Sequence, residues 1–275
     1  MARKSTLGLV YCHFVLEMFL EFNYAILHLS KPRQGASMVS LVIRKAALAV
    51  FLFAVALGSA SAQAQRQEQR QDQQRQDQRQ HQPGRFDFYL LALSWSPSFC
   101  EATSESGRQA PREQCGERSY SFVVHGLWPQ YERGFPKDCQ VPAPRLNREI
   151  MSSMLDLMPA PRLIFHEWDQ HGTCSGLAAR AYFDLVRKAR EAVKIPEVYT
   201  APKATLTVAP DEVEEAFVRA NPGLSRTAIA VTCGSTRLSE VRVCMSRDLK
   251  FRDCSEIDRR ACRRDKLIMP PVRGG

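Results

Sequence analysis

Beyond its first quarter, the 275-residue chain has no uncharged apolar run of about eighteen residues, the length that crosses a bilayer. This excludes a polytopic membrane protein for that part. The chain also lacks the close C-x-x-C pairs of zinc sites, an Asn-x-Ser/Thr glycosylation signal and any internal repeat. Hydrophobic residues make up 44% and charged residues 24%, with a net charge of +9. This composition is typical of a globular protein and excludes a wholly disordered or fibrous one.

The first 62 residues predict a leader rather than part of a folded domain. We interpret residues 1–37 as an extension produced by an over-extended start, with Met38 as the true initiator. In residues 38–62, two basic residues precede an apolar run of 12, Ala46–Leu57, and small residues lead to Ala62. This order is typical of a secretory signal peptide that is cleaved after Ala62. The alternative, an uncleaved anchor helix near residues 8–29, is disfavoured because charged residues interrupt it.

The remaining chain divides into a linker and one domain. Residues 63–85 consist mainly of Gln, Arg and Asp, and contain no side chain that could build a core. They predict a disordered, solvated linker, since ordering them would bury too little apolar surface. Residues 86–275 have the length of a single domain. Strand patterns followed by helix patterns and then more strand patterns predict an α+β fold.

The predicted elements follow from the periodicity of the apolar residues. Alternating or short apolar runs predict strands, and apolar residues three and four apart predict helices. The expected strands are Asp87–Trp95, Ser119–His125, Thr227–Cys233, Glu240–Met245 and Leu249–Cys254, and the expected helices are Arg145–Met158, Ala178–Val193 and Asp211–Ala220.

Cysteine is abundant in this domain. Eight of the nine cysteines follow residue 86, and an even count behind a signal peptide predicts four disulfides formed in an oxidising compartment. A bacterial periplasm fits this prediction as well as any other secretory route. The spacing alone leaves the pairing open.

Histidine is scarce in the domain and clustered. Its three histidines lie in two segments, FVVHGLWP at residues 122–129 and FHEWDQHGTC at residues 165–174. A zinc helix motif needs histidines four residues apart, whereas His166 and His171 are five apart, so metal binding is disfavoured. A cysteine nucleophile is disfavoured because the even count assigns Cys174 to a disulfide. Metal-free catalysis by two histidines remains, and it suits RNA, whose 2′-hydroxyl is a built-in nucleophile.

These two segments resemble the active-site segments of the ribonuclease T2 family, the secreted base-nonspecific endoribonucleases. LSWSPSFC at residues 93–100 and ANPGL at residues 220–224 resemble the family as well. The resemblance implies a central antiparallel sheet flanked by helices. It also implies that His125 is the general acid, that His171 is the general base and that Glu167 supports the transition state.

The resemblance extends to substrate-binding residues, with one departure. It implies that His166 holds phosphate and that Trp128 lies near the base site, although a buried core role for Trp128 is an equal alternative. The family usually has Lys immediately before its second catalytic histidine, where this chain has Gln170. Glutamine carries no charge and should stabilise a developing negative charge less well. We therefore expect a slower enzyme, or one that takes a cation from an arginine elsewhere.

The resemblance also implies disulfide pairs, partners and a location. The pairs are Cys100–Cys115, Cys139–Cys174, Cys233–Cys262 and Cys244–Cys254. We expect a monomer that cleaves RNA but not DNA, needs no metal or cofactor, has no stable membrane insertion after signal cleavage, and is secreted to the periplasm or the medium. Two alternatives remain open. Gln170 favours an RNA-binding or signalling protein with weak catalysis, and the Gln-rich segment favours a tethered envelope protein.

Overall fold

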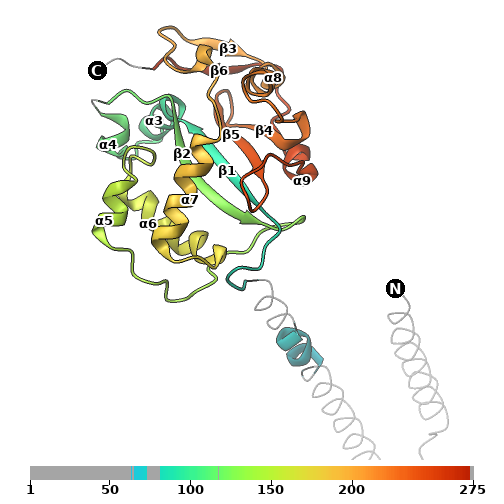
Figure 1. Ribbon diagram of the computed structural model, residues 1–275. Coiled ribbons are helices and arrows are strands. Elements are labelled where there is room, and N and C mark those ends of the chain that lie inside the picture. The colour runs from blue at the N-terminus through green and yellow to red at the C-terminus, as the bar shows by residue number, and fades with distance from the viewer. Residues whose placement is uncertain (1–62, 64, 73–80, 117, 273–275) are drawn as a thin grey trace, which may run out of the picture. The chain divides into compact units, whose positions relative to one another are not determined.

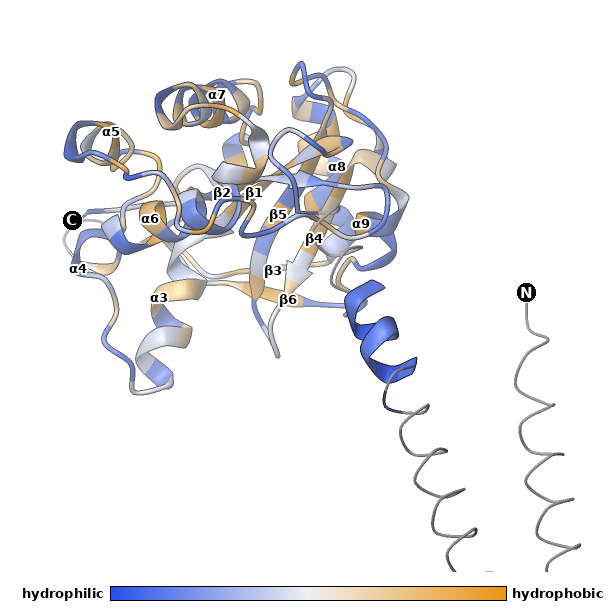
Figure 2. Ribbon diagram, turned by 90° about the horizontal axis from the view of Figure 1, so that it is seen from below, coloured by the Kyte–Doolittle hydropathy of each residue, from blue (hydrophilic) through white to orange (hydrophobic). Residues whose placement is uncertain are grey.

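A computed structural model describes residues 63, 65–72, 81–116 and 118–272 (Figure 1). The predicted leader, residues 1–62, lies outside the described residues. The chain divides into two compact units, Met1–Asp72 and Gln73–Gly275. In the first unit, residues 63 and 65–72 are helical and exposed, and Figure 2 shows this helix as hydrophilic along its length. The composition that predicts a solvated linker also suits an exposed helix, because Gln, Arg and Glu are good helix formers.

The second unit contains the predicted α+β fold, built on a four-stranded antiparallel sheet of order β2-β1-β5-β4. The strands are β1 (Phe88–Trp95), β2 (Phe122–Gln130), β4 (Ile229–Cys233) and β5 (Leu238–Met245). A smaller antiparallel sheet pairs β3 (Leu206–Val208) with β6 (Leu267–Met269). Segments from both ends of the domain thus meet in the central sheet (Figure 1).

Helices flank this sheet, as Figure 1 shows. Helix α7 (Ala179–Glu191) packs against β1 and β2, and α8 (Pro210–Ala220) packs against β4. The helix predicted at Ala178–Val193 turns its apolar side chains to the core, with Tyr182 and Phe183 buried in the main cluster. The other helices are α3 (Ser96–Glu105), α4 (Arg112–Cys115), α5 (Arg148–Ser153), α6 (Pro161–Gln170) and α9 (Ser255–Arg259), with short 3-10 turns η1 (Gly172–Ser175), η2 (Glu197–Tyr199) and η3 (Arg226–Ala228).

The two faces of the central sheet differ in chemistry. In β1, Leu91 and Leu93 point into the main core, whereas Phe88 and Leu90 belong to a small second cluster with the Cys244–Cys254 disulfide. Side chains alternate between faces along a strand. Ser94 therefore shares the second face, which we call the site face, and pairing across the sheet adds polar residues of β5 to it.

A β-bulge interrupts the pairing of β1 with β2. Ala92 pairs with Gly126 and Leu93 pairs with Val124, so His125 is an extra residue with no partner in β1. The bulge resets the alternation of β2. Val124 and Leu127 both point into the core, and His125 is directed to the site face. Bulges commonly re-aim side chains beside active sites.

Three predicted elements differ from the structure. The strand expected at Ser119–His125 runs instead from Phe122 to Gln130; it passes through Pro129 because β2 lies at the sheet edge, where proline is tolerated. The helix expected at Arg145–Met158 is only α5, which begins after the Asn147 cap; the Asn147 side chain accepts a hydrogen bond from the Ile150 amide at 2.8 Å. The strand expected at Leu249–Cys254 is wrong. Leu249 has a φ of 61° and ends a turn, and only a single bridge from Phe251 to Met245 follows.

Four disulfides hold the loops to this framework. They join the pairs that the resemblance implies, Cys100–Cys115, Cys139–Cys174, Cys233–Cys262 and Cys244–Cys254. Within the described part of the chain, no helix is both long and apolar enough to cross a membrane.

Candidate active site

The structure brings His125 between two carboxylates. Its Nδ1 makes a short hydrogen bond with Oε1 of Glu240 on β5, and its Nε2 lies 3.6 Å from Oε1 of Glu167 on α6. Burial alone would lower the pKa of His125, but the hydrogen bond and charge of Glu240, with the charge of Glu167, outweigh it and raise the pKa. The two carboxylates therefore favour the protonated imidazole.

The carboxyl group of Glu167, on α6, lies next to Gly126 of β2. Its Oε2 accepts a hydrogen bond from Nε1 of Trp128 at 2.5 Å. A Cβ at Gly126 would lie 2.1 Å from that oxygen and 2.2 Å from the indole nitrogen, so only glycine permits the contact. The Glu167 side chain is 1% exposed. Burial raises its pKa to about 7, against the opposing effects of His125 and Trp128.

His171 enters the site from the end of α6. The helix stops at Gln170, and His171 turns away with φ −120° and ψ −45°. Gly172 follows directly; a Cβ there would lie 2.5 Å from the Trp168 ring. The His171 ring lies 5.4 Å from the Trp128 ring, and its buried Nδ1 has no hydrogen-bond partner among the described residues. Burial, with the charges of His166 and His125, lowers the pKa of His171 to about 4.

Trp128 contacts both histidines, with its ring 5.1 Å from the His125 ring and 5.4 Å from the His171 ring. One imidazole is biased toward the protonated form and the other toward the neutral form. A proton donor and a proton acceptor that contact one aromatic ring are close enough to carry out acid–base chemistry on one substrate. Trp128 is partly exposed, which favours the substrate-side role over the core role. Trp95 and Trp168 are buried in the core.

A cavity of about 260 Å³ opens beside His171. Its walls include Gln170, Trp128 and two arginines, Arg242 and Arg260. His166 is not among the residues that line this cavity. It is exposed on α6, and its charge helps to lower the pKa of His171. Of the residues predicted from the sequence, the structure thus brings five together and leaves His166 at the edge.

Two residues of β5, Glu240 and Arg242, belong to the site but were not predicted from the sequence. Both point to the site face, because Glu240 pairs with Ser94 and Arg242 pairs with Ala92. Burial alone would raise the pKa of Glu240, but the hydrogen bonds and charges of His125 and Arg242 hold it at about 2. The available signal was a strand with two charged residues spaced by two between buried apolar residues.

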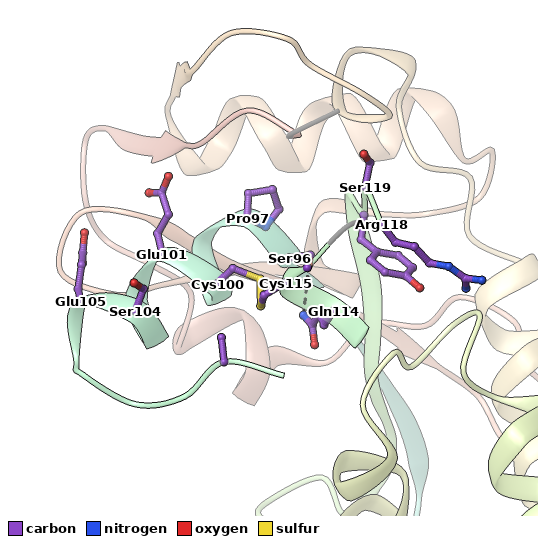
Figure 3. Close-up of a pocket in the computed structure, with 13 residues that line it drawn as sticks. Ser96, Pro97, Cys100, Glu101, Ser104, Glu105, Gln114, Cys115, Arg118 and Ser119 are labelled. Atoms are coloured by element: carbon purple, nitrogen blue, oxygen red, sulfur yellow. Dashed lines mark hydrogen bonds between the residues drawn. A yellow bond between two sulfur atoms is a disulfide. The ribbon is translucent and has the colours of Figure 1, made fainter. Parts of the chain in front are cut away.

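A larger cavity of about 540 Å³ lies elsewhere, between α3 and α4 beside the Cys100–Cys115 disulfide (Figure 3). Its lining includes Glu101 and Glu105 but none of the three histidines of the domain, so it does not serve the chemistry above. Among the described residues, no group of three or more His, Cys, Asp or Glu is arranged to hold a metal ion.

Comparison with known proteins places this geometry in context. A profile described as the Ribonuclease T2 family matches residues 86–254. A ribonuclease from Aeromonas hydrophila is 42% identical over 110 residues, 40% of this chain and 47% of that protein. A probable ribonuclease from Haemophilus influenzae is 38% identical over 120 residues, 40% of this chain and 44% of that protein. The chain thus spans a little less than half the length of these two relatives.

The fold is also found in solved structures. An RNase-related protein from Calystegia sepium aligns with a TM-score of 0.55 and 21% identity, over 68% of this chain and 98% of that one. At this level of identity the likeness concerns the arrangement of the elements.

Proposed function

This chain belongs to the ribonuclease T2 family, and on that premise we propose that it is a secreted, metal-independent endoribonuclease that cleaves single-stranded RNA with little base specificity. The observation that carries the proposal is the contact of both His125 and His171 with the Trp128 ring, with the pKa values of the two histidines shifted in opposite directions. A two-histidine mechanism needs one imidazole in each protonation state at the same pH.

His171 is the general base in this proposal. Its lowered pKa keeps it neutral, so it accepts the proton of the ribose 2′-hydroxyl. The 2′-oxygen attacks the adjacent phosphorus and forms a new P–O bond. His125, whose raised pKa favours the protonated form, donates its proton to the 5′-oxygen as the P–O5′ bond breaks. The products are a 2′,3′-cyclic phosphate and a free 5′-hydroxyl.

The second step reverses the two roles. His171 is now protonated and His125 neutral, so His125 accepts a proton from water while water attacks the cyclic phosphate. His171 returns its proton to the 2′-oxygen, which leaves a 3′-phosphate. Both histidines regain their starting states, so the cycle consumes only water and RNA, without a cofactor.

Glu167, Trp128, Gln170 and His166 complete the proposed site. The buried Glu167 carboxyl, 3.6 Å from His125, stabilises the imidazolium of that histidine. Trp128 and Gln170 line the cavity that would hold the nucleotide next to the scissile bond. His166, exposed on α6, would contact a phosphate further along the chain.

The proposal also covers substrate and location. DNA lacks the 2′-hydroxyl nucleophile and should not be cleaved. The predicted signal peptide and the four disulfides favour export to the periplasm or the medium. We propose that the exported domain acts as a monomer and has no membrane insertion.

The test is cleavage of bulk RNA by oxidised protein that begins at Gln63, in excess EDTA, with single-stranded DNA in parallel. We expect RNA fragments that end in 2′,3′-cyclic phosphate, no cleavage of DNA, and at least about a 10²-fold loss in His125→Ala. Circular dichroism would show that the variant is folded. If folded, fully disulfide-bonded parent protein released no fragments, the nuclease proposal would fail and an RNA-binding role would replace it.

A further inference from the structure

The centre around His125 holds two carboxyl groups, at a site that would bind a phosphodiester. Glu167 and Glu240 both contact His125, and the neighbouring wall at Gln170 carries no charge. A phosphate that gains negative charge in the transition state needs a fixed positive group within hydrogen-bonding reach. On the proposed function, such a group must come from another part of the cavity.

Two arginines line that cavity, Arg242 and Arg260. Arg260 is 69% exposed and paired with Glu256, whereas Arg242 is held beside His125 and is placed to be that group. It projects from β5 on the site face and lines the same cavity as Gln170 and His171. Its guanidinium lies over the Trp128 ring, 5.3 Å from the centroid. The side chain is 30% exposed, so a ligand in the cavity can reach it.

Glu240 fixes the orientation of this guanidinium. Nε and Nη2 of Arg242 both contact Oε2 of Glu240, at 2.9 and 2.8 Å. The other oxygen, Oε1, accepts hydrogen bonds from His125 and from the Ser94 hydroxyl. One carboxylate therefore holds the arginine and the histidine together, and the two N–H groups of Nη1 lie outside the pair.

A guanidinium held along one edge by a carboxylate and on one face by an indole loses little freedom when it binds an anion. We propose that Arg242 binds the scissile phosphate in the cavity beside His171 and supplies the positive charge that position 170 lacks. This inference rests on the proposed function for the identity of the phosphate as RNA.

The test compares Arg242→Gln with a matched control, Arg252→Gln. Arg252 is also 30% exposed, is also ion-paired with a glutamate, Glu132, at 2.7 Å, and also lies over an aromatic ring, that of Phe88, at 4.6 Å. It is not among the residues that line the cavity. The control thus removes the same type of interaction away from the site.

The first readout is binding, measured by calorimetry at low salt without any turnover. The probes are the four nucleoside 3′-monophosphates, and the tightest is compared with its phosphate-free nucleoside. We expect Arg242→Gln to weaken nucleotide binding at least about tenfold, to leave nucleoside binding unchanged, and to differ clearly from Arg252→Gln. Equal losses in the two variants, an equal loss for the nucleoside, or no nucleotide binding by the parent would each overturn the inference.

The second readout is cleavage. In Arg242→Gln we expect kcat/KM on RNA to fall about 10²-fold, the loss typical of one charge-stabilising donor. Adding Gln170→Lys to this variant should restore more of the rate than the same change gives in the parent, because both positions face one cavity. An equal gain in both backgrounds would contradict a shared phosphate.

The two readouts separate the inference from the proposed function. A parent that cleaves RNA while Arg242→Gln binds and cleaves normally would retain the nuclease proposal and remove the role of Arg242. A parent that fails to cleave RNA but binds nucleotides through Arg242 would support the phosphate site and remove the nuclease proposal.

Discussion

Glu167→Gln should make the protein more stable and less active, and the gain in stability should depend on pH. Glu167 is 1% exposed, and burial raises its pKa from 4.5 to about 7. A carboxyl with a raised pKa binds its proton more tightly in the folded state than in the unfolded state. The stability that the folded protein gains from this tighter proton binding is therefore complete below pH 4.5, and it is lost as the pH rises through about 7.

The size of the effect follows from that shift. A rise from 4.5 to about 7 corresponds to about 3 kcal/mol of stability lost once the carboxylate is ionised. Glutamine cannot ionise, and its side-chain oxygen can still accept the Trp128 hydrogen bond. We therefore expect a gain of ~2–3 kcal/mol at pH 8, or ~5–10 °C in Tm, little change near pH 4.5, and about a 10²-fold fall in kcat/KM on RNA.

Glu240→Gln is the control of opposite sign. Its contacts with His125 and Arg242 hold the Glu240 pKa at about 2 instead of 4.5. A depressed pKa contributes stability that is present above pH 4.5 and is lost as the pH falls through about 2. This variant should therefore lose on the order of 3 kcal/mol at pH 7, although both glutamates contact the same histidine.

Urea unfolding of the oxidised protein at pH 4.5, 6 and 8 measures both variants against the parent. The difference between Glu167→Gln and the parent should grow with pH, whereas Glu240→Gln should be less stable than the parent throughout this range. A stability difference for Glu167→Gln that is the same at all three pH values would refute the reasoning, because it would mean that Glu167 does not titrate differently in the folded state.

Three further results should follow from the site. In a pH–rate profile, kcat/KM for RNA should rise through about pH 4 as His171 loses its proton, and should fall above the raised pKa of His125. Glu240→Gln should shift this fall to lower pH, because it removes the carboxylate that raises the His125 pKa. Gly126→Ala should abolish most activity and lower the free energy of unfolding by ~1–3 kcal/mol, because the new Cβ would lie 2.1 Å from Oε2 of Glu167. The control is Gly234→Ala, whose Cβ would have no neighbour closer than 3.8 Å. Equal losses of stability in thermal unfolding of the two variants would contradict this expectation. Reduction with dithiothreitol should lower Tm sharply, since a native disulfide typically contributes ~2–5 kcal/mol, and an unchanged Tm under full reduction would contradict a structural role.

The sequence predicts the parts of this fold that are specified locally. Helices α7 and α8 follow from apolar spacing and from proline and glycine at their ends, and both lie within two residues of their predicted bounds. Strands β1 and β5 are also found where the apolar runs occur. The wrong strand at Leu249–Cys254 shows the limit, because a turn with a left-handed Leu249 is invisible in a pattern of apolar residues.

The site could be predicted only where its residues cluster along the chain. His125, Glu167, Gln170 and His171 occupy two short segments, and their unusual composition marks them. The bulge that turns His125 to the site face depends on pairing with β1, which no local pattern records. The pairing of the cysteines likewise came from resemblance and not from spacing.

Glu240 and Arg242 show why the rest could not be predicted. They lie more than 100 residues from His125 in the chain, in a segment without histidine, glycine or any motif. Only the order β2-β1-β5 places that strand one strand away from β2, which carries His125, and only the register of Ser94 with Glu240 sets the carboxylate at His125. The role assigned to Glu240, which is to raise the pKa of His125, depends on the contact between these two side chains. Its chemistry can therefore be inferred from the structure, whereas the chain alone shows an ordinary strand with two charged residues.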